Sequence, residues 1–207
     1  MGSKNKVVFA YRVRVDDGKA PCIDDGMLSL ACCKRKLRRI IANEQQRRDD
    51  VEFYLLGICT GKAKHNILFC AKLDAPMLAT DFYSKYLDRK DSLYTLKDGV
   101  LERNTRHPCV HSTQEDYAAD VGDPETQWVL LSHEFKYFGI SPLPINEDYT
   151  FLSDEFLPAR QGHRPKKPYA AREGHEKLHE YIMEKIGSFD SSYQPDSQMP
   201  FPPPEKC

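Results

Sequence analysis

Residues 16–39 read DDGKAPCIDDGMLSLACCKRKLRR, and this stretch decides the fold that we expect for the chain. Two aspartate pairs in it each precede a glycine, in Asp16-Asp17-Gly18 and in Asp24-Asp25-Gly26. Glycine adopts positive φ without steric cost, and aspartate side chains accept hydrogen bonds from nearby backbone groups. The chain is therefore predicted to reverse direction twice before its first long helix.

After the second turn, apolar residues recur at the spacing of one helical face. They are Leu30, Cys33, Leu37 and Ile40. We therefore predict an amphipathic helix over residues 30–41, with Cys33 buried beside Leu37.

The same helix is strongly basic. Its cations and those that follow it are Lys34, Arg35, Lys36, Arg38, Arg39, Arg47 and Arg48, with Glu44 as the one acid among them. Backbone N–H groups at a helix start, together with nearby cations, stabilise phosphate or carboxylate groups. The pattern indicates an anion site at the start of the helix, and a solvated amphipathic helix is the alternative.

This stretch resembles a known family, the nucleotide modification associated domain of the second type. Members of that family carry D-x-G-x-A-P-x(4)-G, followed by a run similar to T-L-A-C-C-K-P-K-I-R-R. The matching residues here are Asp16, Gly18, Ala20, Pro21 and Gly26, followed by LSLACCKRKLRR over residues 28–39. Arg35 stands where the family usually has proline. Looser matches at residues 50–57, 91–94, 111, 128–132, 135–139 and 162–163 extend the resemblance over roughly residues 7–184.

The resemblance implies association with systems that modify bases in DNA, and binding of a nucleotide or an altered base. It implies no particular reaction. The residues expected at the ligand are Cys32, Lys34, Lys36, Arg38, Arg39, His111, Tyr137 and His163. In this hypothesis the cations bind phosphate and the histidines hydrogen-bond to base edges, while Tyr137, Phe138 or Trp128 offers an apolar face to the base.

The near-neutral composition limits the kind of nucleic-acid contact that we expect. The chain has 30 Lys and Arg against 31 Asp and Glu, a formal net charge of -1 and a pI of about 6.7. A protein that coats nucleic acid non-specifically needs an excess of cations to release counterions. Contact with a nucleotide or with DNA is therefore predicted to be local, and no cofactor or metal is expected.

The cysteines indicate a reducing compartment. Seven of them form an odd set, and no apolar N-terminal segment resembles a signal peptide, which together predict a cytoplasmic protein. No run of residues is apolar enough to cross a membrane, so no membrane partner is expected.

The remaining sequence predicts an α+β fold. Strands are expected over residues 7–15, 51–60, 67–73 and 127–137, a short helix over 80–87, a hairpin around 97–99 and a final helix over 170–186. The strands 51–60 and 67–73 are expected to pair as a hairpin, because a turn-forming segment separates them. Together they predict one domain over residues 1–187, with a small, curved, mixed β-sheet or partly closed β-barrel, PUA-like by analogy, flanked by helices. Residues 188–207 form a Ser/Pro-rich tail that is predicted to be disordered.

Two other classes of function remain open at this level. A nucleotide-modifying enzyme would need a converging acid or base, which Asp16, Asp17 or His111 could supply, although its catalytic residues are unknown. In such an enzyme, Cys32 beside Lys34 could act as a nucleophile with a lowered pKa.

The second alternative is a zinc-dependent hydrolase. His175-Glu176-Lys177-Leu178-His179 matches H-E-x-x-H, which on a helix places two imidazoles on one face beside a carboxylate. Such a site needs a third protein ligand. The candidates downstream of the motif are acidic residues, Glu180, Glu184, Asp190, Asp196 and Glu205. The Lys177 and Glu180 neighbours favour an exposed surface helix instead.

Overall fold

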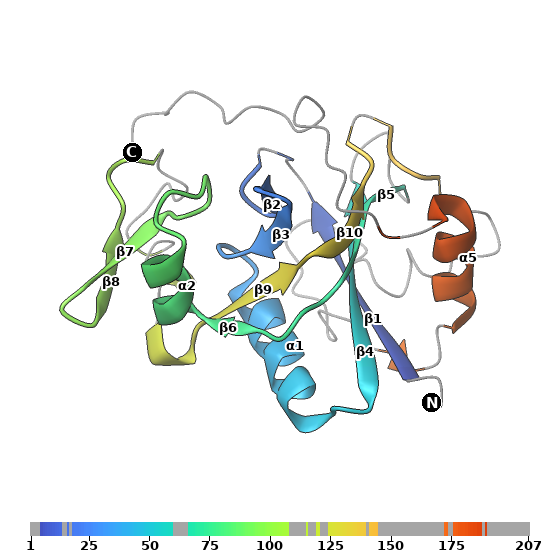
Figure 1. The fold of residues 1–207 in the computed structure, drawn as a ribbon, viewed down its shortest axis with the longest axis horizontal. Coiled ribbons are helices and arrows are strands. Elements are labelled where there is room, and N and C mark those ends of the chain that lie inside the picture. Colours follow the sequence, from blue (N-terminus) through green and yellow to red (C-terminus); the bar gives the residue numbers. More distant parts are fainter. Residues whose placement is uncertain are drawn as a thin grey trace. The chain divides into compact units, whose positions relative to one another are not determined.

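The computed structural model describes residues 5–13, 16, 18–59, 66–107, 115, 119–120, 124–139, 141–144, 172–173, 176–187 and 189, with the backbone alone at 124, 172–173, 176–179 and 186. The protein is mixed α+β, rich in strands and with few helices (Figure 1). The chain forms two compact units. Unit 1 comprises residues 1–15, 48–73 and 133–197, and unit 2 comprises residues 16–47, 74–132 and 198–207. The single domain over residues 1–187 stays a prediction.

Unit 1 contains a five-stranded sheet. Its order is β10 (Glu134–Tyr137), β5 (Ile67–Lys72), β4 (Val51–Cys59), β1 (Asn5–Val13) and β11 (Arg172–Glu173). The central strands β1 and β4 are parallel, and every other neighbouring pair is antiparallel, so the sheet is mixed, as predicted. The antiparallel β4 and β5 confirm the expected hairpin. The described strands form open sheets and do not close into a barrel.

The two faces of this sheet carry different side chains, because successive residues of a strand point to opposite sides. On one face, Val8, Leu56 and Ile58 belong to an apolar cluster that includes Ile182 of α5 (Glu176–Ile186). On the other face, aromatic rings pair across strands. Phe9 stacks on Phe53 and Tyr11 packs edge-to-face on Phe69, with ring centroids 6.4 Å and 5.9 Å apart.

Gly57 of β4 makes room for one of these rings. It pairs with Phe69, and a Cβ atom at position 57 would lie 2.2 Å from Phe69 Cε1 and 3.1 Å from Val13 Cγ2. Phe69 is fully buried against Tyr11, so its ring has little room to move. We expect Gly57→Ala to lower the free energy of unfolding by about 1–3 kcal/mol, measured by urea denaturation, as overpacking does elsewhere.

A double variant provides the control for this prediction. Shortening the opposing side chain by Phe69→Leu removes the clash, so the cost of Gly57→Ala should be smaller in that background. If the losses of unfolding free energy caused by Gly57→Ala and Phe69→Leu simply add in the double variant, the close approach of the Phe69 ring to Gly57 is contradicted.

Unit 2 contains a four-stranded antiparallel sheet. Its order is β2 (Cys22–Asp24), β3 (Met27–Leu30), β9 (Trp128–Ser132) and β6 (Met77–Leu78). Asp25 and Gly26 link β2 to β3 with φ of 49° and 69°, the turn that suits two antiparallel strands. This confirms the second predicted reversal. The hairpin expected around residues 97–99 is also confirmed, by β7 (Tyr94–Lys97) and β8 (Val100–Arg103).

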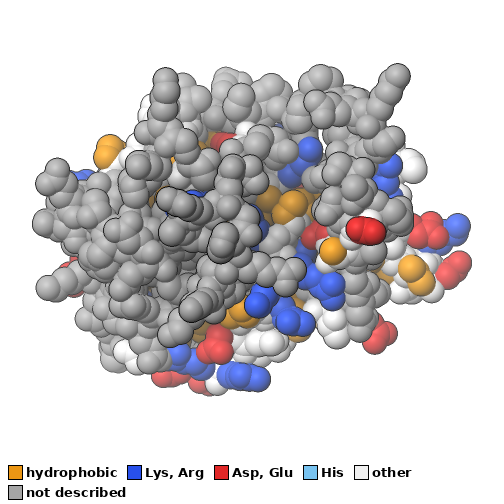
Figure 2. Space-filling model, turned by 180° about the vertical axis from the view of Figure 1, so that it is seen from behind, with side chains coloured by type: hydrophobic (Ala, Val, Ile, Leu, Met, Phe, Trp, Pro, Cys, Tyr) orange, Lys and Arg blue, Asp and Glu red, His pale blue; other side chains and the backbone are white. Residues whose placement is uncertain are grey.

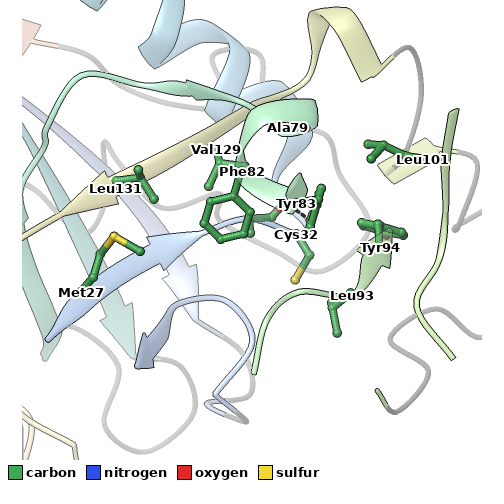
Figure 3. Packing of buried hydrophobic residues seen from close by; sticks show 11 residues of the cluster. Met27, Cys32, Ala79, Phe82, Tyr83, Leu93, Tyr94, Leu101, Val129 and Leu131 are labelled. Carbon is green, nitrogen blue, oxygen red and sulfur yellow. Dashed lines mark hydrogen bonds between the residues drawn. The ribbon is translucent and has the colours of Figure 1, made fainter. Parts of the chain in front are cut away.

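Helices α1 (Arg35–Arg47) and α2 (Ala79–Lys85) and the short η2 (Pro124–Thr126) complete the described part of unit 2. Its core is shown in Figure 3, where Phe82 and Tyr83 of α2 lie beside Cys32. Tyr83 packs edge-to-face on both Phe82 and Tyr94, with ring centroids 5.2 Å apart in each pair. The segment that joins β3 to α1 is therefore part of an aromatic core.

Three predicted boundaries are wrong. The helix expected from Leu30 begins at Arg35, because Leu30 belongs to the buried strand β3. The strand expected over residues 127–137 is divided between β9 and β10, which belong to different sheets. The final helix begins at Glu176, since residues 172–173 form β11 on the edge of the unit 1 sheet.

The described surface carries charges of both signs. Figure 2 shows one face, on which Lys and Arg side chains lie in several places and Asp and Glu side chains in others. This mixture agrees with the near-neutral net charge of -1. Among the described helices, none has the length and apolar character needed to span a membrane.

Candidate functional site

The start of α1 has an uncommon backbone conformation. Cys33 and Lys34, just before the helix, both have positive φ, 55° and 47°. The first helical hydrogen bond runs from the Arg38 N–H to the Lys34 carbonyl oxygen, at 3.0 Å. Non-glycine residues rarely hold positive φ, and each instance persists only where the surrounding structure fixes it. These two residues turn the chain from the buried β3 into α1.

The five cations at this helix start differ in exposure. Arg38 is buried, with 1% of its surface exposed, while Lys34 and Arg35 are half-buried. Lys36 and Arg39 are exposed, and the first turn of α1 contains no acidic residue. Positive charge therefore gathers at the end of the helix where the backbone dipole is also positive.

Arg38 is held by three protein oxygens. Its Nε donates to the Cys33 carbonyl at 2.8 Å, its Nη1 donates to the Trp128 carbonyl at 2.6 Å, and its Nη2 donates to Asp120 Oδ1 at 3.0 Å. The guanidinium thus ties α1 to β9 and to residue 120. Its position indicates a role in fixing the helix start, and the exposed cations beside it are the ones accessible to a ligand.

Residues 119–120 are held by more than one element of unit 2. The Ala119 carbonyl accepts a hydrogen bond from Arg35 Nη1 at 3.1 Å, and the hydroxyl of Tyr94 donates to Asp120 Oδ2 at 2.6 Å. Burial, followed by the Asp120 charge, raises the pKa of Tyr94, so this hydroxyl keeps its proton and remains a donor. Asp120 therefore joins α1 to β7 through its two carboxylate oxygens.

Cys32 does not have the environment of an activated nucleophile. Its side chain is fully buried, and its Sγ donates to the Lys19 carbonyl at 3.4 Å. A hydrogen bond with Cys33, and then burial, raise the pKa of the Cys32 thiol well above its ordinary value. This contradicts the lowered pKa expected for a Cys32 nucleophile, since the thiol stays protonated at neutral pH.

A second polar network lies entirely inside unit 2. Asp91 is fully buried; its Oδ1 accepts from Arg89 Nε at 3.0 Å and its Oδ2 accepts from the Ser29 hydroxyl. Arg89 also donates to Ser29 Oγ at 2.8 Å and to the carbonyls of Asp24 at 2.6 Å and Met27 at 3.4 Å. The network closes the β2–β3 hairpin against the segment after α2. Its polar side chains hydrogen-bond to one another and to backbone carbonyls, as in a network with a structural role.

The aromatic candidates are divided between the two units. Trp128 is half-buried at the start of β9, and its carbonyl contacts Arg38 of the basic helix start. Tyr137 is half-buried in β10 of unit 1, and Phe138 packs against the apolar cluster under α5. The structure thus brings Trp128 together with α1, while a shared site for Tyr137 and the α1 cations stays a prediction.

Several candidates lie outside the described residues. These are His111 and His163, proposed for base edges, Asp17, and His175 of the H-E-x-x-H motif, and the side chain of His179 is not described either. Among the described residues, no group of three His, Cys, Asp or Glu side chains could hold a metal ion.

Sequence reasoning did not identify Arg89, Asp91 and Asp120 as buried charges. Residues 88–125 contain many polar residues, a pattern typical of a solvated loop. The one available signal was that Asp91 opens a segment of looser family resemblance. Burial of a charged residue depends on distant partners, here Ser29 for Asp91 and Arg38 for Asp120, which local sequence does not reveal.

Comparison of the chain with models of protein families, with curated proteins and with solved structures gave no match.

Proposed function

We propose that this protein binds a nucleotide or an exposed, modified base of DNA, and that the start of α1 binds the phosphate. The observation that carries this proposal is the exposed pair Lys36 and Arg39 among the first five residues of a helix whose first turn contains no acid. We also propose association with DNA base modification, on the resemblance described above.

An anion at this position would offset an unfavourable arrangement of charges. The first N–H groups of a helix have no carbonyl partner within the helix, and together they act as a partial positive charge. Cations placed there are unfavourable by about 0.3–1 kcal/mol each, whereas an acid would be favourable by a similar amount. A phosphate satisfies both the N–H groups and the cations, and a helix start is a common place for it.

Trp128 is the aromatic residue that is best placed for the base. It belongs to the same unit as α1, it is half-buried, and its backbone carbonyl accepts a hydrogen bond from Arg38 Nη1 at 2.6 Å. Stacking of a base on an aromatic ring contributes about 1–3 kcal/mol. We keep Tyr137 and the histidines at 111 and 163 as further proposed contacts.

We also propose a PUA-like fold and a cytoplasmic location for the protein. A PUA-like fold is supported by the small mixed sheet of unit 1. A cytoplasmic location is supported by the odd number of cysteines, seven, and by the buried thiols of Cys22, Cys32 and Cys70, because thiols persist in reducing compartments.

A titration with matched variants tests phosphate binding. The double variant Lys36→Ala/Arg39→Ala should weaken binding of nucleoside phosphates and short single-stranded DNA by at least about tenfold, which is about 1.4 kcal/mol. The slope of log affinity against log salt for the DNA should also become shallower by about 1.4, since two phosphate contacts are lost. Fluorescence anisotropy at two salt concentrations measures both quantities.

The control removes the same charges elsewhere in unit 2. Arg47 in the last turn of α1 and Lys97 in β7 are exposed, so Arg47→Ala/Lys97→Ala changes the net charge equally. This variant should keep the parent affinity within about twofold, since its cations lie away from the helix start. Equal losses in the two double variants would show that only overall charge matters and would remove the proposed site.

A further inference from the structure

The β7–β8 hairpin forms a two-stranded sheet of its own, separate from the four-stranded sheet of unit 2. A two-stranded hairpin alone is only marginally stable in water, so its order depends on side chains that hold it to the rest of the unit. Tyr94 of β7 is such a side chain. Its ring packs edge-to-face on Tyr83 of α2, and its hydroxyl donates to Asp120 Oδ2 at 2.6 Å.

The start of α1 also depends on side-chain contacts. Cys33 and Lys34 have φ of 55° and 47°, a conformation that persists only where the surrounding structure fixes it. Arg38 supplies part of this support, because its Nε donates to the Cys33 carbonyl at 2.8 Å while its Nη2 donates to Asp120 Oδ1 at 3.0 Å. The hairpin and the helix start therefore share one carboxylate.

Burial makes this shared carboxylate hard to replace. The side chains of Asp120 and Arg38 are 4% and 2% exposed, so water does not readily take the place of either donor. Each oxygen of Asp120 accepts from a different element, and movement of the carboxylate toward one donor lengthens its bond to the other. A displacement of the hairpin is therefore felt at the start of α1.

We propose that Asp120 couples the β7–β8 hairpin to the start of α1, so that the two elements open together in fluctuations smaller than complete unfolding. The hairpin carries two of the exposed large apolar side chains of unit 2, Leu96 and Val100. Asp120 thus forms a conformational device that transmits a disturbance of this exposed hairpin to the basic helix start. The inference does not require the protein to bind a nucleotide.

Two backbone amides report on the two elements separately. The Arg38 N–H donates to the Lys34 carbonyl at the helix start, at 3.0 Å, and the Asn104 N–H donates to the Leu93 carbonyl at the base of the hairpin, at 2.8 Å. Native-state hydrogen exchange of the full-length protein in low urea measures the opening of each bond. Both amides should exchange faster than those that pair β3 with β9, and their rates should rise with urea along one shared slope, smaller than that of complete unfolding. Exchange of the Arg38 amide only by complete unfolding would overturn the proposal.

Tyr94→Phe removes the hydroxyl that bonds to Asp120 and keeps the ring in the aromatic core. Both amides should then exchange about tenfold faster, because a hydrogen bond to a buried charge is lost in each opening. Tyr86→Phe is the matched control, since Tyr86 contacts Phe82 and Lys85 through its ring and its hydroxyl is not bonded to Asp120. It should leave both rates within about twofold of the parent. An unchanged rate at Arg38 in Tyr94→Phe, with faster exchange at Asn104, would overturn the coupling.

A double variant tests whether the coupling passes through Asp120. Asp120→Asn keeps the size of the side chain and removes the charge that the two donors share. In this background, the effect of Tyr94→Phe on the Arg38 amide should shrink by at least about threefold, because neighbouring groups of one network are not additive. The same tenfold effect with asparagine at position 120 would overturn the role of Asp120. These rates are measured without ligand, so their outcome is independent of the titration of Lys36→Ala/Arg39→Ala.

Discussion

Replacing Arg38 by alanine is expected to lower the free energy of unfolding by about 3–5 kcal/mol, the usual effect of removing one partner of a buried ion pair. The side chains of Arg38 and Asp120 are 2% and 4% exposed, and their charged atoms lie 3.0 Å apart. The substitution leaves the Asp120 carboxylate buried without its cation, and the carbonyls of Cys33 and Trp128 lose a donor as well. Urea denaturation followed through Trp128, the single tryptophan, measures the change.

Arg39→Ala is the matched control, since it removes the same side chain at an exposed position one residue further along α1. It should change the free energy of unfolding by no more than about 0.5 kcal/mol. Similar losses for Arg38→Ala and Arg39→Ala would contradict the role of Arg38 as a buried tie between α1 and β9.

Asp91→Ala is expected to have an effect of similar size, also about 3–5 kcal/mol, because it leaves Arg89 as a buried cation without its carboxylate. Asp91 is fully buried and accepts from both Arg89 and the Ser29 hydroxyl. Chemical denaturation measures the loss, and the hairpin of β2 and β3 should be the first part to exchange its amides.

Asp88→Ala, at an exposed aspartate of the same segment, controls for the removal of a carboxylate. It should be within about 0.5 kcal/mol of the parent. A second variant, Asp91→Asn, keeps the size of the side chain and part of its hydrogen bonding, so it should be less damaging than alanine. Stability of Asp91→Ala equal to that of Asp88→Ala would show that the network contributes nothing to unit 2.

Charged residues that lie close together in the sequence differ in role, because some are buried in hydrogen-bond networks and others are exposed. Arg38 and Lys36 are two residues apart in a basic run, yet Arg38 is bonded to protein oxygens whereas Lys36 is exposed. Loss of binding in an Arg38 variant would therefore report on the folded state of the helix start as well as on the ligand. This is why the binding test uses Lys36 and Arg39.

The hairpins of the fold could be predicted because their signals are local. Asp25-Gly26 and Asp98-Gly99 each join two short strands through residues with positive φ. The pairing of β4 with β5 followed from two apolar segments separated by a turn-forming segment. In each case the residues that determine the structure lie within a few positions of one another.

The start of α1 could not be predicted from apolar spacing. All four residues of β3 are buried, three of them apolar, and a short, mostly apolar segment fits a buried strand as well as a helix. The spacing of Leu30 with Leu37 therefore extended the predicted helix backwards into β3. For the same reason Cys33 was expected to be buried, whereas of these two neighbouring cysteines it is Cys32 that is fully buried.

The division of residues 127–137 depends on tertiary structure. β9 pairs with β3 of unit 2, while β10 pairs with β5 of unit 1, and the two units meet in the chain between Ser132 and His133. No glycine or proline marks this point in the sequence. The candidate site depends on tertiary structure in the same way. The basic run can be read from the sequence, but the burial of Arg38 depends on its contacts with Asp120 and Trp128.

Backbone amide chemical shifts, recorded while a nucleoside monophosphate is added to the reduced protein, test the central claim most directly. The account predicts that the largest shift changes fall on residues 35–39, at the start of α1, and that they vanish in Lys36→Ala/Arg39→Ala while that variant stays folded. Shift changes confined to other segments, or none at a concentration that saturates binding, would contradict an anion site at this helix start.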